Sequence, residues 1–161
     1  MRKRCSVIFR KNLLYVISEW ILSKILSKRK QRFKRLKIVM KKEVYFAGES
    51  RKKGTGQLIG TCGFHLINNH HRRAEIGYEL DDTYWGQGYA TEALQAILAY
   101  GFETLQLIRI AAVVYVENKA SQKLLSKAGF QEEGLLRKHM IQNGVAHDTI
   151  LYSLLKEEWK K

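Results

Sequence analysis

Residues 84–93 read YWGQGYATEA and are the most informative stretch of this chain. A strand-like run over 74–80 leads into them, and a helix-like run over 90–105 leads out. Two glycines between a strand and a helix N-terminus leave several backbone N–H groups open at the positive end of the helix dipole. This arrangement predicts a site for a pyrophosphate group, although the same pattern is also typical of an ordinary turn between a strand and a helix.

The segments that follow predict more strands and one more helix. An apolar, β-branched run over 108–116 is typical of a buried central strand. A short helix opens at 118–121 and ends near Gly129. Two long strands, over 130–141 and 147–155, are joined at Asn143-Gly144, a strong hairpin signal. With a further strand before 74–80, across a hairpin tip at 70–73, the predicted order is strand, strand, helix, strand, helix, strand, strand.

Six pieces of sequence occur in a fixed order along the last two-thirds of the chain: LIGTCGF (58–64), AEIGYEL (74–80), YWGQGYATEAL (84–94), NKASQKLL (118–125), AGFQEEGLLR (128–137) and a late Asp148. In these pieces the chain resembles the GNAT superfamily of N-acetyltransferases, and within it the ribosomal-protein N-terminal acetyltransferases of the RimJ/RimL type. The resemblance implies an α+β (mixed α/β) fold, in which helices flank a central, mostly antiparallel sheet that is splayed at the cofactor site. One departure is that Trp85 stands first in the superfamily pattern Gln/Arg-x-x-Gly-x-Gly/Ala, as is usual in this subgroup.

The resemblance implies acetyl-CoA as co-substrate and assigns residues to it. Backbone N–H groups between Gly86 and Thr91 would bind the pyrophosphate, and pantetheine would run near Glu79 to Asp81. The parallel runs 74–80 and 108–116 are expected to separate, with the thioester in the gap. The residues expected to bind the coenzyme are Leu80, Asp81, Trp85, Gly86, Gln87, Gly88, Tyr89, Ala90, Thr91 and Asn118.

Acetyl transfer to an amine needs a base, a donor for the oxyanion and a proton for the leaving thiolate. Glu75 and Glu79 share one strand and are the candidate bases, with Glu75 first because it lies in the AEIGY motif; either could also be a surface carboxylate. Ser121 matches the position of a hydroxyl near the coenzyme sulfur in this subgroup, and its alternative role is a helix cap. Tyr115 is a further proton donor or a core residue. No nucleophile with an adjacent base emerges, which favours direct transfer in a ternary complex.

The other polar residues predict no metal site. His70 and His71 fit a solvated hairpin tip without further ligands. His139 and His147 fall in the last two strands, near where an acceptor could enter, and are interpreted as surface residues. Asp148 is interpreted as a turn or network residue.

The formal net charge of +14 is unevenly distributed. Residues 1–53 hold 18 Lys and Arg against 3 Asp and Glu, whereas residues 54–161 hold 11 against 12. The segment that carries the motifs is therefore nearly neutral, and the excess charge lies in a segment without a readable family motif. In that segment a helix over 13–26 and a short strand over 43–47 are predicted.

Two interpretations of residues 1–53 stay open. The chain has no proline, although about eight would be expected at an average usage of roughly 5%. Codons compatible with residues 47–51, read in another frame, encode Trp-Gly-Ile-Ala, which is similar to the second strand of the family. The segment is thus a divergent N-terminus or an out-of-frame translation, preceding a GNAT domain over 54–161. An out-of-frame segment would leave an inactive acetyl-CoA-binding remnant.

The remaining expectations concern partners and location. The basic segment, with its interleaved aromatic residues, offers binding to nucleic acid or to a membrane surface as a further alternative. Cys5 and Cys62 give no disulfide framework, which fits a reducing cytoplasm. The apolar run Leu13 to Ile17 is too short to span a bilayer. The expected acceptor is a primary amine, on a protein N-terminus, a polyamine or an antibiotic, and the expected assembly is a monomer or a homodimer.

Overall fold

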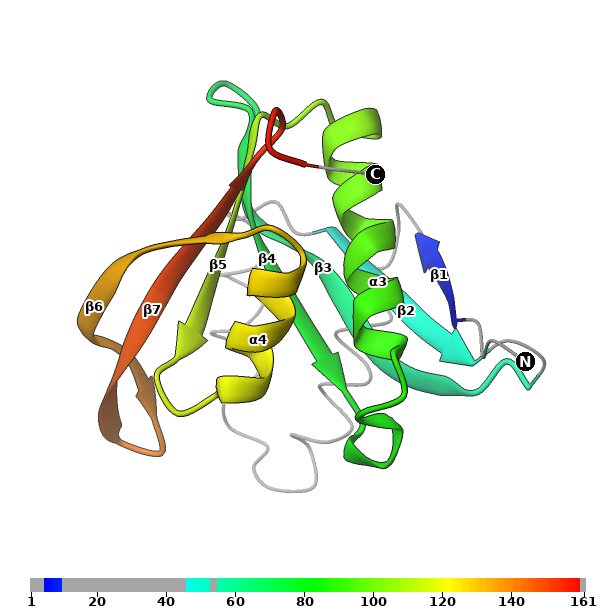
Figure 1. The fold of residues 1–161 in the computed structure, drawn as a ribbon, viewed down its shortest axis with the longest axis horizontal. Coiled ribbons are helices and arrows are strands. Elements are labelled where there is room, and N and C mark those ends of the chain that lie inside the picture. Colours follow the sequence, from blue (N-terminus) through cyan, green and yellow to red (C-terminus); the bar gives the residue numbers. More distant parts are fainter. Residues whose placement is uncertain (1–4, 10–45, 53–54, 160–161) are drawn as a thin grey trace, which may run out of the picture.

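The computed structural model describes residues 5–9, 46–52 and 55–159. Their strands form a single sheet in the order β1-β2-β3-β4-β5-β7-β6, with helices α3 and α4 packed against it (Figure 1). The strands are β1 (Cys5–Phe9), β2 (Phe46–Lys52), β3 (Leu58–Asn68), β4 (Arg73–Leu80), β5 (Arg109–Tyr115), β6 (Gln131–Gln142) and β7 (Val145–Leu155). The helical elements are η1 (Asp82–Tyr84), α3 (Tyr89–Ala99), η2 (Tyr100–Thr104) and α4 (Lys119–Lys127).

The sheet is antiparallel except at its centre. Among the described strands, only β4 and β5 run parallel, and their pairing ends after three residue pairs, at Glu75 opposite Ala111. Beyond that point the two strands separate, as Figure 1 shows. The predicted fold, a mostly antiparallel sheet that splays between these two strands, is confirmed.

Both helices pack on one face of the sheet (Figure 1). The α3 helix turns its apolar side to the sheet, and the π-helical turn η2 continues it, so that the two together occupy the helix predicted over 90–105. In α4 the side chain of Asn118 accepts a hydrogen bond from the Ser121 N–H at 3.0 Å, which caps the first turn. The shared core contains Cys62, Phe64, Ile76, Ala93, Leu94, Ile97, Leu98, Ile110 and Leu125.

The first two strands continue the sheet beyond β3. The β1 strand, which the sequence did not predict, pairs antiparallel with β2, and β2 pairs antiparallel with β3. The strand predicted over 43–47 overlaps β2 only at Phe46 and Ala47. Its first residues, and the helix predicted over 13–26, lie outside the described residues. The division of the chain after residue 53 stays a prediction.

An ion pair ties three neighbouring strands together. The Arg109 guanidinium on β5 donates to both carboxylate oxygens of Glu133 on β6, and the Ser153 hydroxyl on β7 donates to Glu133 Oε1 at 2.6 Å. The hydrogen bonds from Arg109 and then Ser153 lower the pKa of Glu133 from 4.5 to about 2. The negative charge of Glu133 is therefore stabilised in the folded state.

Because the folded pKa is depressed, this charge stabilises the fold above pH 4.5 and the contribution is lost as the pH falls toward about 2. We expect Glu133→Gln to lower the free energy of unfolding by about 1 kcal/mol at pH 7, a modest value because the Glu133 side chain is 34% exposed. The difference from wild type should vanish below about pH 2, as measured by urea unfolding across pH. The exposed Glu157→Gln is the control, and parallel pH profiles for wild type and Glu133→Gln would refute the account.

Candidate active site

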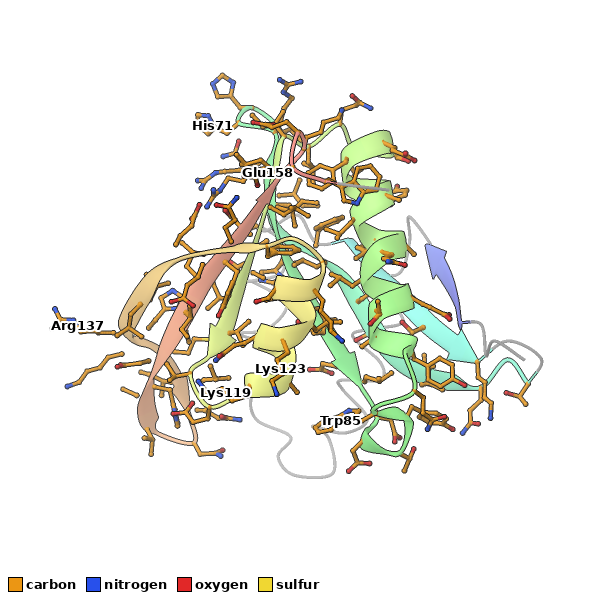
Figure 2. The ribbon with its side chains drawn as sticks, in the orientation of Figure 1. His71, Trp85, Lys119, Lys123, Arg137 and Glu158 are labelled. Atoms are coloured by element: carbon orange, nitrogen blue, oxygen red, sulfur yellow. The ribbon has the colours of Figure 1, made fainter. Side chains whose placement is uncertain are left out.

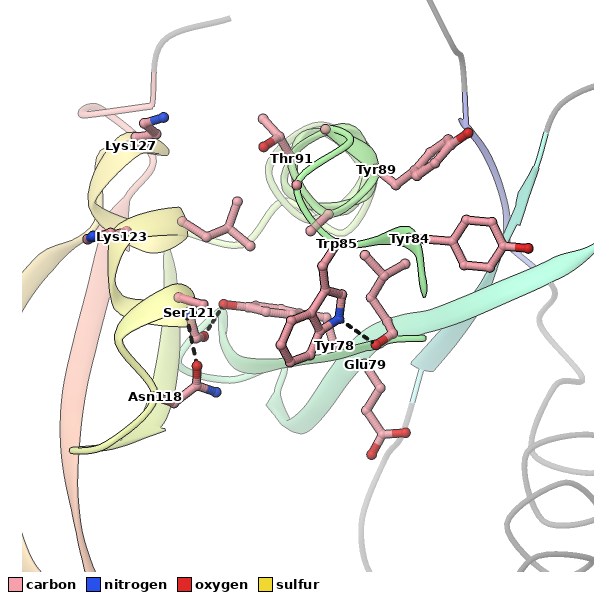
Figure 3. A pocket seen from close by; sticks show the side chains of 16 residues that line it. Tyr78, Glu79, Tyr84, Trp85, Tyr89, Thr91, Asn118, Ser121, Lys123 and Lys127 are labelled. Carbon is pink, nitrogen blue, oxygen red and sulfur yellow. Dashed lines mark hydrogen bonds between the residues drawn. The ribbon is translucent and has the colours of Figure 1, made fainter. Parts of the chain in front are cut away.

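A cavity of about 740 Å³ opens at the C-terminal end of β4, between the first turn of α3 and the length of α4 (Figure 3). Its walls come from three segments that are far apart in the sequence: the end of β4, the loop into α3, and α4. The cavity brings together most of the residues predicted for the site, namely Glu79, Leu80, Trp85, Gly86, Gly88, Tyr89, Ala90, Thr91, Asn118 and Ser121.

The loop before α3 is shaped to accept an anion. Gly86 and Gly88 have φ values of 69° and 87°, a left-handed conformation that favours glycine, and a Cβ atom on either would meet nothing within 4 Å. The first bond of the helix runs from the Glu92 N–H to the Gly88 carbonyl, at 3.1 Å. The N–H groups of the preceding turn therefore have no partner within the helix. Open N–H groups, the positive end of the helix dipole and free space together fit the pyrophosphate of a coenzyme.

Positive side chains line the wall that α4 contributes. Lys123 and Lys127 are one helical turn apart, and both line the cavity. Lys119, one turn before Lys123, also lies on α4 but does not line the cavity (Figure 2). Glu79 contributes the negative charge, and Figure 3 shows it pointing away from α3. The cavity is therefore more positive on the side of the two helices, which suits a phosphate-bearing ligand.

Two of the residues predicted to bind the coenzyme also brace the loop through their side chains. The side chain of Asp81 accepts hydrogen bonds from the N–H and the hydroxyl of Thr83, at 3.0 and 2.5 Å. The Gln87 side chain donates to the Thr83 carbonyl at 3.0 Å. Neither lines the 740 Å³ cavity, although Asp81 lines a smaller cavity beside it. Their contact with the coenzyme stays a prediction.

Trp85 connects the loop to β4. Its indole Nε1–H donates to the Leu80 carbonyl at 2.9 Å, and the residue is 62% exposed (Figure 3). A large aromatic ring held at the mouth of the cavity offers an apolar surface to a ligand. Trp85, which stands where the superfamily pattern has Gln or Arg, is thus one of the residues that line the cavity.

The two candidate bases lie on the face of β4 that is turned away from the helices. Side chains alternate along a strand, and Ile76 packs into the core while Tyr78 reaches α4, so Glu75 and Glu79 point to the other face. Glu75 is hydrogen-bonded through Oε1 to His65 Nε2 at 2.8 Å and does not line the cavity. Glu79 is exposed and does line it. Of the two carboxylates, Glu79 is therefore the better placed to act as the base.

Ser121 has its backbone and side chain engaged separately. Its N–H is capped by Asn118, so its hydroxyl is not used as a cap. The hydroxyl lies 2.5 Å from the phenol oxygen of Tyr78, across the gap between α4 and β4 (Figure 3). Burial raises the pKa of Tyr78 above its usual value of 10, and the hydrogen bond with Ser121 offsets part of this effect.

The remaining polar candidates lie outside the cavity. Tyr115 packs edge-to-face on His147, with ring centroids 5.5 Å apart, and His139 Nδ1 is 3.1 Å from the Thr149 hydroxyl. Asp148 accepts a hydrogen bond from the Lys138 N–H at 2.7 Å, at an irregularity in the pairing of β6 with β7. This is the network role that was predicted for Asp148.

Several residues of the cavity were missed in the sequence. Two patterns in the sequence could have revealed them. Residues two apart on a strand share one face, so Tyr78 lies on the same face of the strand as Ile76. Residues four apart on a helix share one face, so Lys123 and Lys127 lie on the same face of α4. The missed residues are Tyr78, Tyr84, Ala120, Lys123, Leu124 and Lys127.

Gly60 on β3 sets the position of the end of β4. A Cβ atom there would lie 2.3 Å from the Glu79 carbonyl oxygen and 3.1 Å from Leu80 Cα, and backbone atoms cannot yield without moving the strand. We expect Gly60→Ala to lower the free energy of unfolding by about 2 kcal/mol or more, as measured by urea unfolding. Gly77→Ala is the control: its nearest neighbour is the movable ring of His65, at 3.3 Å. Equal stabilities for the two variants would contradict this explanation.

The described part of the chain holds neither a metal-ligand cluster nor a helix able to span a membrane. Within residues 5–9, 46–52 and 55–159, no group of three or more His, Cys, Asp and Glu side chains is placed to hold a metal ion. In the same ranges, no helix combines the length and hydropathy needed to cross a membrane. His70 and His71 lie in the exposed turn between β3 and β4 (His71 is labelled in Figure 2).

Comparison with known proteins supports the resemblance. The family described as acetyltransferase (GNAT) domain matches residues 17–131. The chain is 50% identical over 105 residues to the uncharacterized N-acetyltransferase YoaA of Bacillus subtilis (strain 168), which covers 65% of this chain and 59% of YoaA. The chain therefore belongs to the GNAT acetyltransferase family, as its motifs predicted.

More distant relatives are named for two kinds of acceptor. The ribosomal-protein-serine acetyltransferase of Escherichia coli (strain K12) is 34% identical over 97 residues, which is 60% of this chain and 54% of that protein. The spermidine N(1)-acetyltransferase of the same organism is 31% identical over 104 residues, or 65% of this chain and 56% of that protein. In each case the chain spans less than two-thirds of the length of the curated relative.

A solved structure supports the fold of the described residues. A spermidine N-acetyltransferase chimera from Vibrio cholerae and hSSAT superposes with a TM-score of 0.75, covering 95% of this chain and 96% of that chain. At 24% sequence identity, this similarity establishes the fold alone.

Proposed function

We propose that this protein transfers an acetyl group from acetyl-CoA to a primary amine, directly in a ternary complex. The observation that carries the proposal is the single cavity in which the glycine loop, the N-terminus of α3, Asn118 and Ser121 meet. Acetyl-CoA, when bound, supplies the activated acetyl thioester. The acceptor is a protein N-terminus, a polyamine or another small amine. In support, one relative is named as a ribosomal-protein-serine acetyltransferase and another as a spermidine N(1)-acetyltransferase.

Binding would rest mainly on the backbone. The phosphates would be bound by the open N–H groups of the first turn of α3 and by the backbone at Gly86 and Gly88, not by side chains. This explains how Trp85 can stand where the superfamily pattern has Gln or Arg. Lys123 and Lys127 add positive charge along α4. These features favour a ligand with several phosphate groups.

The chemistry would rest on two side chains that line the cavity. The Ser121 hydroxyl is a proton donor, and the Glu79 carboxylate is an acceptor that can take a proton from an incoming ammonium, directly or through water. Glu75, held by His65 outside the cavity, would act at most through its neighbours. We expect Glu79→Gln to reduce turnover about tenfold or more and Glu75→Gln to reduce it by less than about threefold.

The function is tested by a thiol-release assay on the purified full-length chain. The acceptors are a peptide with a free serine N-terminus, spermidine and an aminoglycoside, each supplied with acetyl-CoA. Release of thiol that depends on both the protein and one of these amines is the expected result. Binding of coenzyme A without turnover on any acceptor would favour the remnant, and failure to bind it would overturn the proposal.

A further inference from the structure

The hydrogen bond between Tyr78 and Ser121 joins the two sides of the cavity. Tyr78 lies on β4, three residues beyond the last residue paired with β5, and Ser121 lies in the first turn of α4. Their oxygens are 2.5 Å apart, and both residues line the cavity (Figure 3). The bond is therefore made where the two strands have separated and a ligand would lie.

The chemistry of the two hydroxyls indicates the direction of this bond. Tyr78 is protonated at neutral pH, as an ordinary phenol is, and burial raises its pKa further. A phenol is the stronger donor and an alcohol oxygen the stronger acceptor, so the favoured arrangement has Tyr78 donating to Ser121 Oγ. Ser121 then keeps its own proton for another acceptor, and Asn118 already holds the Ser121 backbone in place. A hydroxyl that accepts one hydrogen bond donates a stronger one.

We propose that Tyr78 is the positioning residue for Ser121, donating to Ser121 Oγ so that the Ser121 proton is directed into the cavity. This inference rests on the proposed function, in which Ser121 is the proton donor to the leaving sulfur. Tyr78 itself does not exchange a proton with the substrate. Its effect should therefore pass through Ser121 and vanish when the Ser121 hydroxyl is removed.

A double-mutant cycle tests this dependence. Tyr78→Phe keeps the ring and removes only the hydroxyl, and it should lower kcat about fivefold to tenfold with little change in the KM for acetyl-CoA. In a Ser121→Ala background the same substitution should change kcat by less than about twofold. The control is Tyr152→Phe, which removes another hydrogen-bonded phenol, from a buried tyrosine on β7 outside the cavity, and should leave kcat unchanged. The proposal would be overturned if Tyr78→Phe lowered kcat by the same factor in the wild-type and Ser121→Ala backgrounds. It would also be overturned if Tyr78→Phe raised the KM for acetyl-CoA and left kcat unchanged.

A second measurement does not need turnover. A hydroxyl directed at the sulfur stabilises its thiolate form, so the thiol of bound coenzyme A should have a lower pKa in the wild type than in Tyr78→Phe or Ser121→Ala. The thiolate is followed by its ultraviolet absorbance as the pH is raised, with Tyr152→Phe again as the control. Identical thiol pKa values in wild type and Tyr78→Phe would sink the inference.

The two proposals fail in different ways. If the wild-type chain neither binds coenzyme A nor releases thiol, the proposed function fails and the role of Tyr78 falls with it. If the wild type is active and the effects of Tyr78→Phe and Ser121→Ala simply multiply, only the positioning role fails.

Discussion

Replacing Gly88 with valine is expected to weaken the binding of acetyl-CoA at least about a hundredfold. Gly88 has a φ of 87° and immediately precedes α3. A β-branched residue strongly disfavours that conformation, so the loop would shift and the N–H groups of the first turn would lose their arrangement. Its side chain would also enter space that holds no protein atom within 4 Å of the Cβ position. Isothermal calorimetry on the purified variants measures the effect.

The control for this prediction is Gly144→Val. Gly144 has a similar φ of 81°, its Cβ position is also open, and it lies in the hairpin turn between β6 and β7. Both variants should therefore lose a similar amount of stability, whereas only Gly88→Val should lose affinity. Equal affinities for acetyl-CoA in the two variants would show that the loop before α3 does not bind the phosphates.

Replacing Ser121 with alanine is expected to lower kcat about a hundredfold, the lower end of the range for a positioned proton donor. The KM for acetyl-CoA should change by less than about threefold, because the hydroxyl is needed for the reaction more than for binding. The helix itself should survive, since the Asn118 side chain caps the Ser121 N–H and that group remains in the variant. Steady-state kinetics with the best acceptor of the panel measures both parameters.

Ser126→Ala, at an exposed position of α4, is the control for this substitution. It removes a hydroxyl from the same helix at a residue that does not line the cavity, and should leave kcat and KM unchanged. A kcat for Ser121→Ala within about twofold of wild type would remove Ser121 from the mechanism.

The fold was predictable because its signals are local. The glycine loop, the Asn143-Gly144 hairpin and the apolar run over 108–116 each specify an element within about a dozen residues, and β4, β5, α3 and α4 follow them closely. The β1 strand was not predictable in the same way. It has five residues and its partner β2 lies some forty residues further along the chain, so only a non-local pairing reveals it.

The site was predictable at the backbone and less so at the side chains. Glycines and a helix N-terminus are enough to predict a phosphate-binding loop from the sequence, and the structure places these residues on one cavity. The motif around AEIGY drew attention to Glu75, whereas the alternation of β4 turns Glu75 and its partner His65 away from the helices and turns Tyr78 toward them. Strand alternation was the better guide here, because it determines which side chains can meet across the gap. Asp81 and Gln87 were predicted to bind the coenzyme because they lie in the motif, and their side chains also hold the loop in shape through hydrogen bonds with Thr83.

The measurement that tests the central claim most directly is calorimetric titration of the full-length wild-type chain with acetyl-CoA. We expect one site per chain, with a dissociation constant between about 1 μM and 1 mM, the range usual for the KM of an enzyme's substrate. The heat of binding should be lost in Gly88→Val but not in Gly144→Val. The absence of binding by the wild-type chain, or equal binding by Gly88→Val, would contradict the claim that the loop before α3 is a coenzyme site.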